Sequence, residues 1–423
     1  MLSVSDAERL IFDAVRPLHP ERNTEVVNLL DASGRILATS VSSQLDFPHW
    51  DNSAMDGYAV RFEDVNACSD SEPAVLKIVE EIPAGTPPQK TLQPGQAARI
   101  LTGSMMPEGA DTVVMQENTR LDGDGVAVLV PPENPGQFVR RRGSFYQAGN
   151  PLIEGGVRLQ AADIAVFAAA QATKVRVFRK PRVAILSTGS ELVSPEQHLQ
   201  PGQIVDSNQY ALASFLSALG MEPLRVGIVE DDPATLKYSI AEALNWGDVV
   251  VSTGGVSVGD YDYIDRILEQ LGGDLLVRSI AIKPGKPLTF AQFPKQQALY
   301  FGLPGNPVSA LVSCWRFVKP ALLKLAGLRR GWEPIFVKAK TRVELRSGGG
   351  RETYLWGRLL ATETGLEFEI PGGSFSSGNL INLMQTNGCA RLPVGTKRVE
   401  AGETVSVLWV DTPISEFGKL KVE

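Results

Sequence analysis

The chain has 423 residues, a net charge of −7 and only three cysteines and three histidines. Such a length exceeds one ordinary hydrophobic core, so we expect several domains. The acidic balance argues against a nucleic-acid partner, and so few cysteines and histidines exclude a zinc or iron–sulfur site. Any metal is therefore expected to be a hard cation held by carboxylates.

The first part of the chain is expected to hold a helix and then a β-rich insert. The run Ser5-Asp6-Ala7-Glu8 predicts a capping box that opens an amphipathic helix. It is no signal peptide, which needs a basic start and an apolar core, and no apolar stretch is long enough to span a membrane. We therefore expect a cytoplasmic protein without a membrane partner. Between 47 and 137, short β-like runs alternate with Pro-Gly turns, which predicts a small domain of hairpins.

The second part is expected to alternate strands with helices and then to become all-β. Between 175 and 327, apolar runs such as 183–186 and 249–251 are each followed by an amphipathic helix. This alternation predicts a mostly parallel sheet with helices on both faces. The runs beyond 328 predict a small β-barrel or sandwich.

The fold class that we predict is therefore multidomain α/β plus β: a central, mostly parallel α/β sheet domain, a β-rich insert and a C-terminal β-barrel-like domain. The predicted boundaries are 1–22 with 175–327 for the α/β domain, 23–46 with 138–174 for a linking domain, 47–137 for the insert, and 328–423 for the C-terminal domain.

Three loops of small residues follow three strand-like runs, at 187–191, 252–259 and 303–310. The first could simply end a strand and cap a helix, and taken alone that interpretation is favoured. In the second, six of eight residues are Gly, Ser or Thr, which favours close approach of a ligand to the backbone. The third is a Pro-Gly-Asn-Pro turn before a helix, a place to hold an anion. Together the loops predict one anionic ligand along the carboxyl edge of a sheet.

Acidic residues lie near these loops and in the insert. Asp262 could cap the helix that follows the second loop or bind Mg²⁺ that bridges phosphate oxygens. One of the neighbours Asp231 and Asp232 is expected to cap another helix, and the sequence leaves open which one. Asp56, within the run 52–60, could belong to a hairpin turn, but the aromatic residues beside it favour a functional role.

Basic residues lie in glycine-rich loops. Lys283 and Lys286 occupy a loop stiffened by proline and glycine, which either forms a solvated turn or holds a dianion. Arg351 follows three glycines, and that turn could bring its guanidinium to an oxyanion. A second Gly/Ser loop in the C-terminal domain contains Ser374 and Ser376.

These motifs resemble those of the molybdopterin molybdenumtransferases, which include the bacterial molybdenum cofactor biosynthesis enzyme and the E domain of gephyrin. The matching runs are 52–60, 187–192, 252–259, 281–287 and 303–310, in that order. The resemblance covers nearly the whole chain. It implies insertion of molybdate into adenylylated molybdopterin, with release of AMP, formation of molybdenum cofactor and Mg²⁺ as cofactor. It also implies an elongated homodimer in which Asp56 could act across the dimer.

The resemblance also implies roles for particular residues. The implied catalytic residues are Asp56, Glu191, Asp231 and Asp262, of which the last three are candidate Mg²⁺ ligands. Asp56 or Asp262 could instead position a water or proton of molybdate. The implied groups for molybdate and phosphate are Lys283, Lys286, Arg351, Ser374 and Ser376. The implied substrate-binding residues are Thr102, Ser187, Thr188, Gly189, Thr253, Gly254, Gly255, Ser257, Gly259, Pro304, Gly305, Asn306 and Pro307.

Two rival functions fit part of this pattern. A molybdopterin adenylyltransferase has a similar α/β domain, but it resembles a compact single domain with a Gly-Gly-Thr-Gly loop, where this chain has Gly254-Gly255-Val256-Ser257. That enzyme could instead be a partner that supplies the adenylylated intermediate. A gephyrin-like scaffold would need a linker and an additional domain, and nothing in this chain resembles them.

Overall fold

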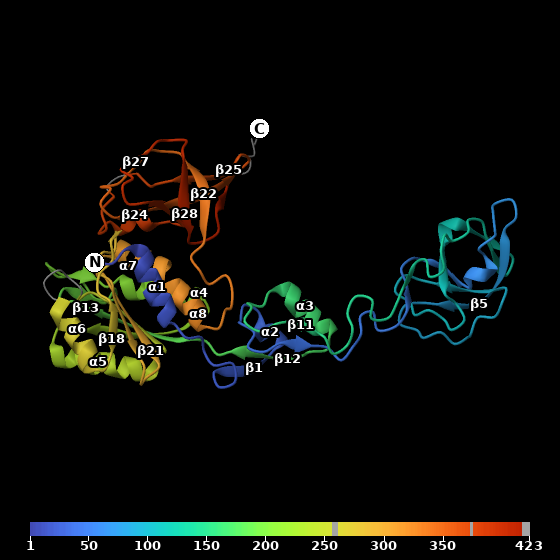
Figure 1. Ribbon diagram of the computed structural model, residues 1–423, viewed down its shortest axis with the longest axis horizontal. Helices are drawn as coiled ribbons and strands as arrows, with labels where there is room; N and C mark the ends of the chain where they lie inside the picture. The colour runs from blue at the N-terminus through green and yellow to red at the C-terminus, as the bar shows by residue number, and fades with distance from the viewer. Residues whose placement is uncertain (256–260, 373–374, 417–423) are drawn as a thin grey trace. The chain divides into compact units, whose positions relative to one another are not determined.

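The computed structural model describes residues 1–255, 261–372 and 375–416, and Figure 1 shows its course. The chain divides into two compact units, one made of 1–39, 155–161 and 174–423, the other of 40–154 and 162–173. The finer division into four domains stays a prediction. Among the described residues, no helix is long and apolar enough to cross a membrane.

A six-stranded sheet forms the centre of the first unit. Four neighbouring strands are parallel, and two antiparallel strands extend one edge. The mostly parallel sheet that the sequence predicts is therefore confirmed. In spatial order the strands are β16 (Glu222–Val229), β13 (Arg182–Thr188), β17 (Val249–Thr253), β21 (Ala298–Leu303), β20 (Thr289–Phe293) and β18 (Asp274–Val277).

Helices cover both faces of this sheet, as predicted (Figure 1). Successive side chains of a strand point to opposite faces, so Ile185 joins one core and its neighbour Ala184 joins the other. The core of Ile185 contains residues of α1 (Val4–Ala14), α4 (Asn208–Ala218), α7 (Pro307–Ser313) and α8 (Lys319–Leu325), and that of Ala184 contains residues of α5 (Pro233–Trp246) and α6 (Tyr261–Gln270). A central strand that is buried on both faces needs an almost continuous apolar run.

Two helices differ in detail from the sequence prediction. The capping box at Ser5 is wrong, because Ser3 caps α1: its hydroxyl accepts from the Asp6 backbone N–H at 3.1 Å and donates to the Asp6 carboxylate at 2.7 Å. Ser3 has the spacing to Asp6 that a capping box requires. The helix expected after the Pro-Gly-Asn-Pro turn begins at Pro307 and contains a π-helical turn, Cys314–Val318, between α7 and α8.

The C-terminal region forms a closed barrel, which confirms the predicted β-barrel-like domain. Its five strands pair in the order β24 (Glu352–Thr362), β25 (Gly365–Glu369), β22 (Phe336–Thr341), β28 (Thr404–Trp409) and β26 (Gly388–Leu392), and β26 pairs again with β24. The strands β19 (Ile282–Lys283) and β29 (Ile414–Ser415) add to β24 in parallel. Through β19, the chain of the α/β domain becomes part of the barrel sheet.

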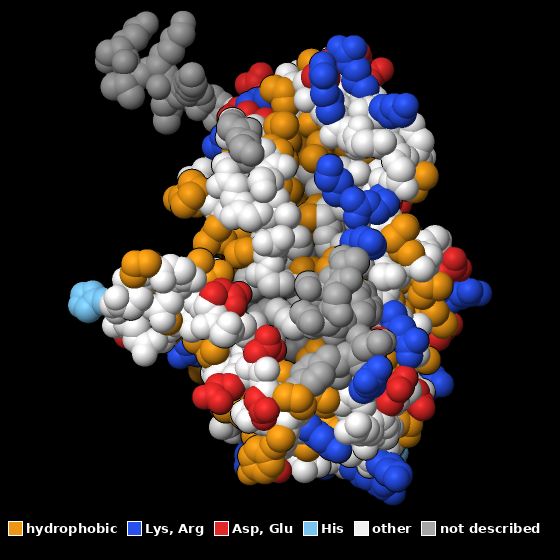
Figure 2. All heavy atoms as spheres, turned by 90° about the vertical axis from the view of Figure 1, so that its left-hand side faces the viewer, with side chains coloured by type: hydrophobic (Ala, Val, Ile, Leu, Met, Phe, Trp, Pro, Cys, Tyr) orange, Lys and Arg blue, Asp and Glu red, His pale blue; other side chains and the backbone are white. Residues whose placement is uncertain are grey.

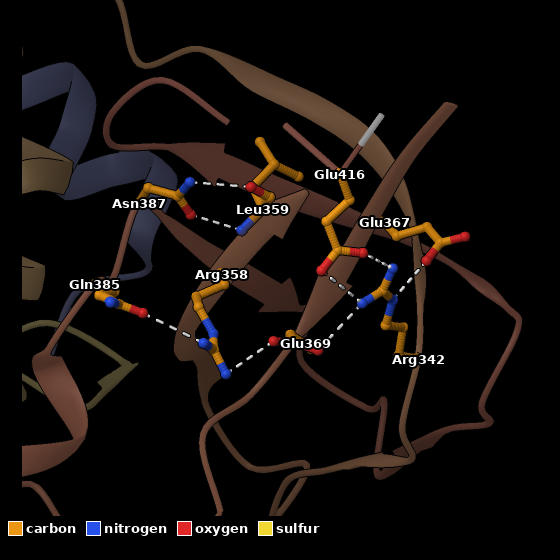
Figure 3. A network of polar contacts seen from close by, with 8 residues as sticks. All are labelled: Arg342, Arg358, Leu359, Glu367, Glu369, Gln385, Asn387 and Glu416. Atoms are coloured by element: carbon orange, nitrogen blue, oxygen red, sulfur yellow. Dashed lines mark hydrogen bonds and ion pairs between the residues drawn. The ribbon is translucent and has the colours of Figure 1, made fainter. Parts of the chain in front are cut away.

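A polar network lies on the barrel surface (Figure 3). The Arg342 guanidinium contacts the carboxylates of Glu367 at 2.5 Å, Glu416 at 2.7 Å and Glu369 at 3.5 Å. Asn387 exchanges two hydrogen bonds with the backbone of Leu359, as a neighbouring strand would. The network holds the chain after β29 against β22 and β25.

The second unit is a curled six-stranded sheet, which confirms the β-rich insert. The turn 122–125 joins two antiparallel strands, with Asp122 opposite Gly125, as in a hairpin. The strand order is β7 (Thr112–Met115), β4 (Gly57–Val60), β6 (Gln96–Ile100), β5 (Ala74–Ile82), β9 (Gly125–Val128) and β8 (Thr119–Asp122). Outside this sheet, nearly all of α3 (Ala161–Ala169) also belongs to the second unit. The helix α2 (Leu29–Ala32) and the antiparallel pair β1 (Thr24–Asn28) and β12 (Lys174–Phe178) belong to the first unit.

Candidate functional site

The carboxyl ends of three parallel strands place two of the predicted loops and the Pro-Gly-Asn-Pro turn side by side. Ser187 of β13 lies opposite Thr253 of β17, which lies opposite Leu303 of β21. The Ser187 and Thr253 hydroxyls are buried and share a hydrogen bond of 2.9 Å. The structure therefore brings these two candidate residues together at one edge of the sheet.

Glycine lets the second loop lie directly against the end of β13. Gly254 has φ +88°, and a Cβ there would stand 2.1 Å from the carbonyl oxygen of Thr188. Gly255 has φ +66°, and its Cβ would stand 2.9 Å from the Thr188 hydroxyl. Within the described residues that buried hydroxyl has no hydrogen-bond partner. It is available to a ligand that reaches this edge. Ser257 and Gly259 lie outside the described residues.

The turn after β21 is held from two sides. The Asn208 amide donates to the carbonyl oxygen of Gly305 at 2.8 Å. Among the described residues, Asn306 makes no side-chain capping bond to α7, and its amide instead reaches the Ser377 hydroxyl at 3.4 Å. Pro304 is buried beneath the turn, and Pro307 begins α7. The turn thus bridges the sheet edge and the barrel.

The structure resolves which of two neighbouring aspartates caps α5. Asp232 accepts from the backbone N–H of Thr235 at 2.9 Å and from its hydroxyl at 3.0 Å. These hydrogen bonds lower the pKa of Asp232 below its ordinary value. Asp231 is exposed and is not the cap. This leaves Asp231, the residue that the resemblance selects, available to a ligand.

Two described acids follow adjacent strands. Glu191 comes after β13 and Asp231 after β16, which are neighbours in the sheet. The Glu191 carboxylate lies against Gly189, where a Cβ would stand 2.7 Å from it. The helix α6 begins at Tyr261, which makes Asp262 its second residue, and the Asp262 side chain lies outside the described part.

These acids have the chemistry of Mg²⁺ ligands, because carboxylate oxygens are the donors that this hard cation prefers. No group of three His, Cys, Asp or Glu residues close enough to hold a metal exists within the described ranges. Glu191 and Asp231 would supply two donors, and the third expected donor is Asp262. The donor set fits Mg²⁺ in kind, and Mg²⁺ remains a proposal.

A cleft of about 410 Å³ lies between the α/β domain and the barrel, and it collects the predicted basic residues. Lys283, Lys286 and Arg351 line it together with Pro304 and Asn306. Figure 2 shows Lys and Arg side chains gathered in a band on one face of the molecule. In the part of the chain that is described, these three cations form no ion pair with a carboxylate.

Strand pairing places these cations. Lys283 of β19 lies opposite Thr353 of β24, and the Arg351 guanidinium donates to the carbonyl oxygen of Ile282 at 3.2 Å. The glycine between the two lysines, Gly285, is buried, and its Cβ would stand 2.6 Å from the Ser313 hydroxyl. The lysine loop is therefore packed against the helix that follows the sheet edge.

Sequence reasoning missed several residues that line the cleft. Trp356 and Phe375 pack with ring centroids 4.3 Å apart, and Arg346 lines the cleft while paired with Glu344. None of these lies in a recognisable motif; only the position of Trp356 on a strand that follows Arg351 could have suggested it. Ser377 also lines the cleft.

The serine loop of the barrel is only partly described. Ser376 is exposed, and its hydroxyl accepts from the Gly378 backbone N–H at 3.4 Å. Ser374 lies outside the described residues. Among the described residues of this loop, Phe375 and Ser377 line the cleft, and Ser377 also contacts Asn306.

Two candidate residues, 46 positions apart, meet in the second unit. The backbone N–H and the hydroxyl of Thr102 each donate to one carboxylate oxygen of Asp56 at 2.7 Å. These hydrogen bonds lower the pKa of Asp56 below its ordinary value. Next to it, Gly57 is buried so closely that a Cβ would stand 2.0 Å from the carbonyl oxygen of Val114. Asp56 is thus an exposed, ionised carboxylate on a rigid strand end.

Comparisons with known proteins cover nearly the whole chain. Three family models match: the MoeA N-terminal region (domain I and II) at 2–170, a probable molybdopterin binding domain at 184–324, and the MoeA C-terminal region (domain IV) at 338–410. A molybdopterin molybdenumtransferase of Nostoc sp. is 55% identical over 96% of this chain and 94% of its own length. One of Haemophilus influenzae is 35% identical over 91% and 93%. The crystal structure of a molybdopterin biosynthesis moeA protein from Pyrococcus horikoshii OT3 matches with a TM-score of 0.83 and 30% identity, over 97% of this chain and 100% of that one.

Proposed function

This chain belongs to the molybdopterin molybdenumtransferase family, and we propose that it transfers molybdenum from molybdate to adenylylated molybdopterin, with release of AMP. The relatives' name supports a transferase of molybdenum cofactor biosynthesis. The observation that carries the proposal is the cleft, in which Lys283, Lys286 and Arg351 come together beside the loops of the sheet edge.

The three cations suit a reaction between anions. Molybdate is a dianion that must enter a site already holding phosphates. A unit charge 4 Å from another is worth about 4 kcal/mol at an effective dielectric constant of about 20. Three cations that pair with no carboxylate among the described residues can therefore offset the repulsion between molybdate and the phosphate oxygens. Cleavage of a phosphoanhydride also needs charge neutralisation on its oxygens more than it needs a covalent nucleophile.

The sheet edge suits the adenylylated substrate. The backbone around Gly254 and the Thr188 hydroxyl, which has no partner among the described residues, would contact a phosphate, while the buried hydrogen bond between Ser187 and Thr253 supports them. Glu191, Asp231 and Asp262 would hold Mg²⁺, which when bound supplies neutralising charge to the anhydride oxygens. Asp56, held by two hydrogen bonds from Thr102, would position a water or a proton of molybdate, and in the proposed homodimer it would do so in the partner's site. The proposed location is the cytoplasm.

The test incubates the purified chain with adenylylated molybdopterin, Mg²⁺ and molybdate and follows AMP release. We expect release that depends on molybdate and yields molybdenum cofactor. Replacing both Lys283 and Lys286 with alanine should raise the molybdate concentration that is needed for AMP release. Replacing Lys338, an exposed lysine of β22, should leave that concentration unchanged. Tight binding of the adenylate without molybdate-dependent release would contradict the proposal.

A further inference from the structure

An arginine buried beneath the cleft joins three distant parts of the chain. Arg316 lies in the π-helical turn between α7 and α8, and only 3% of it is exposed. Its Nε donates to the Tyr354 hydroxyl of β24 at 2.9 Å, and its Nη2 donates to the Glu8 carboxylate of α1 at 2.6 Å. The guanidinium also lies 5.6 Å from the ring centroid of Phe336. One side chain thus ties the helices of the α/β domain to the barrel.

The contacts continue to the cleft wall. Burial raises the pKa of Tyr354, so its hydroxyl keeps the proton that it donates to Glu352 at 2.7 Å. The Glu352 backbone N–H donates to the carbonyl oxygen of Ala281 at 3.1 Å, just before the lysine loop. Ala281 in turn donates to the carbonyl oxygen of Leu2 at 2.8 Å. Tyr354 itself lines the cleft. We call the residues Glu8, Arg316, Tyr354 and Glu352 the brace.

The brace connects the two walls of the cleft. One wall is the strand pair β19–β24, with Lys283 on β19 and Arg351 directly before β24. The other is the turn after β21 and the start of α7, with Asn306 and Ser309. The helix of the second wall runs on through the π-helical turn that carries Arg316, which bonds to Tyr354 of the first wall. Arg316 is therefore one link between the two walls, in addition to the packing of Gly285 against Ser313 of α7.

Stability alone does not account for a buried arginine. Replacing a buried ion pair with apolar side chains is often neutral or stabilising. Arg316 Nη1 is buried and, among the described residues, has no hydrogen-bond partner. An unsatisfied buried donor lowers the stability of the fold further, because it has lost its hydrogen bonds to water. The guanidinium of Arg316 forms a fork of two hydrogen bonds, to Tyr354 and to Glu8. Because a guanidinium is planar and rigid, this fork fixes the directions in which its two partners lie.

We propose that Arg316 is a positioning residue that, through the brace, holds the cation wall at the separation from the sheet edge that molybdenum transfer requires. The inference rests on the proposed function, because it assigns molybdate to the cations and the adenylate to the sheet edge. A misplacement of about 1 Å between two reacting groups can cost about 100-fold in rate. Loss of the fork should therefore slow transfer while each half of the site still binds its own anion.

The test compares Arg316→Lys, Glu8→Gln and Tyr354→Phe with Arg9→Ala as the matched control. Arg9 is on the same helix as Glu8, and its pair with Asp6 at 3.3 Å is exposed and does not reach the barrel. For each protein we would measure kcat for AMP release, the dissociation constants of molybdate and of AMP by calorimetry, and Tm. We expect kcat to fall about 10- to 100-fold in the three brace variants, with both dissociation constants within about twofold of wild type. Arg9→Ala should match wild type.

One further measurement, on the double variant, completes the test. Glu8→Gln should add little to Arg316→Lys, because both break one connected unit. Brace variants that lose Tm but keep kcat would show a structural role only and overturn the inference, as would loss of molybdate binding itself. If wild type releases no AMP, the proposed function fails and the inference with it. If wild type is active and the variants remain equally active, only the inference fails.

Discussion

Replacing Gly254 with alanine tests whether the close contact between the second loop and β13 shapes the site. Gly254 has φ +88°, and an L residue in this left-handed backbone conformation destabilises the fold by about 1 kcal/mol relative to glycine. The new Cβ would stand 2.1 Å from the Thr188 carbonyl oxygen, about 1.3 Å closer than the 3.4 Å of an ordinary contact. Because that neighbour is backbone, no side-chain rotation relieves the overlap, and overpacking adds about 1–3 kcal/mol.

The expected loss in stability is therefore about 2–4 kcal/mol, or roughly 5–15 °C in Tm at about 2–4 °C per kcal/mol. The loop must also move by about 1 Å, for which we expect about a 100-fold loss of kcat/KM in AMP release. Thermal unfolding followed by circular dichroism, with the AMP assay on the same samples, measures both effects.

Gly220→Ala is the matched control. Gly220 has the same φ of +88°, but no described atom lies within 4 Å of the position that a Cβ would take there. It should lose about 1 kcal/mol through the backbone alone and keep its activity within about twofold. If Gly254→Ala were as stable and as active as Gly220→Ala, the close contact with Thr188 would affect neither Tm nor activity, and the reasoning would be refuted.

Other predictions address the insert, the barrel and the thiols. Thr102→Val should raise the pKa of Asp56 toward 3.8, which NMR titration would measure. Because the pKa of Asp56 is lower in the folded state, the stability that this pair contributes is present above about pH 4 and is lost as the pH falls below it. Asp56→Ala should keep its Tm and lose turnover, and a parallel loss of Tm would make Asp56 structural. Arg342→Met should cost at most about 1 kcal/mol at low salt and nothing near 1 M, because its ion pairs are exposed; a salt-independent loss of Tm would contradict this. Burial raises the pKa of Cys314 and Cys389, so a thiol reagent should label them only when urea unfolds the chain, and rapid native labelling would disprove their burial.

Local patterns predicted the sheet edge because each strand end is a short stretch of sequence and the same pattern occurs three times. An apolar run followed by small residues is enough to predict that Ser187 and Thr253 end parallel strands, and parallel pairing then brings their hydroxyls together. The choice between Asp231 and Asp232 could not be made, since both precede the same helix and only the hydrogen bond to Thr235 decides.

The brace was beyond prediction for a different reason. Glu8 and Arg316 are 308 positions apart. The sequence assigned Glu8 to a capping box that the structure does not form, and Arg316 lies in no motif. Arg316 sits in the helical run after the Pro-Gly-Asn-Pro turn, and nothing in that run indicates which residues it contacts. Its partners follow from how the barrel docks on the helices, which is a property of tertiary packing. The same holds for Arg346 and Trp356 in the cleft.

The packing of α1 also bears on how the chain is made. Its apolar face, with Ile11 and Phe12, shares a core with Trp315 and Leu322, about 300 residues later. At about 5–20 residues per second, a ribosome needs about 15–60 s to synthesise that interval. During this time only the earlier parts of the same core, such as Ile185 and Val277, are present to cover α1. The apolar face of α1 therefore cannot be fully covered before α8 has been synthesised, which makes the completion of this core a late step in folding.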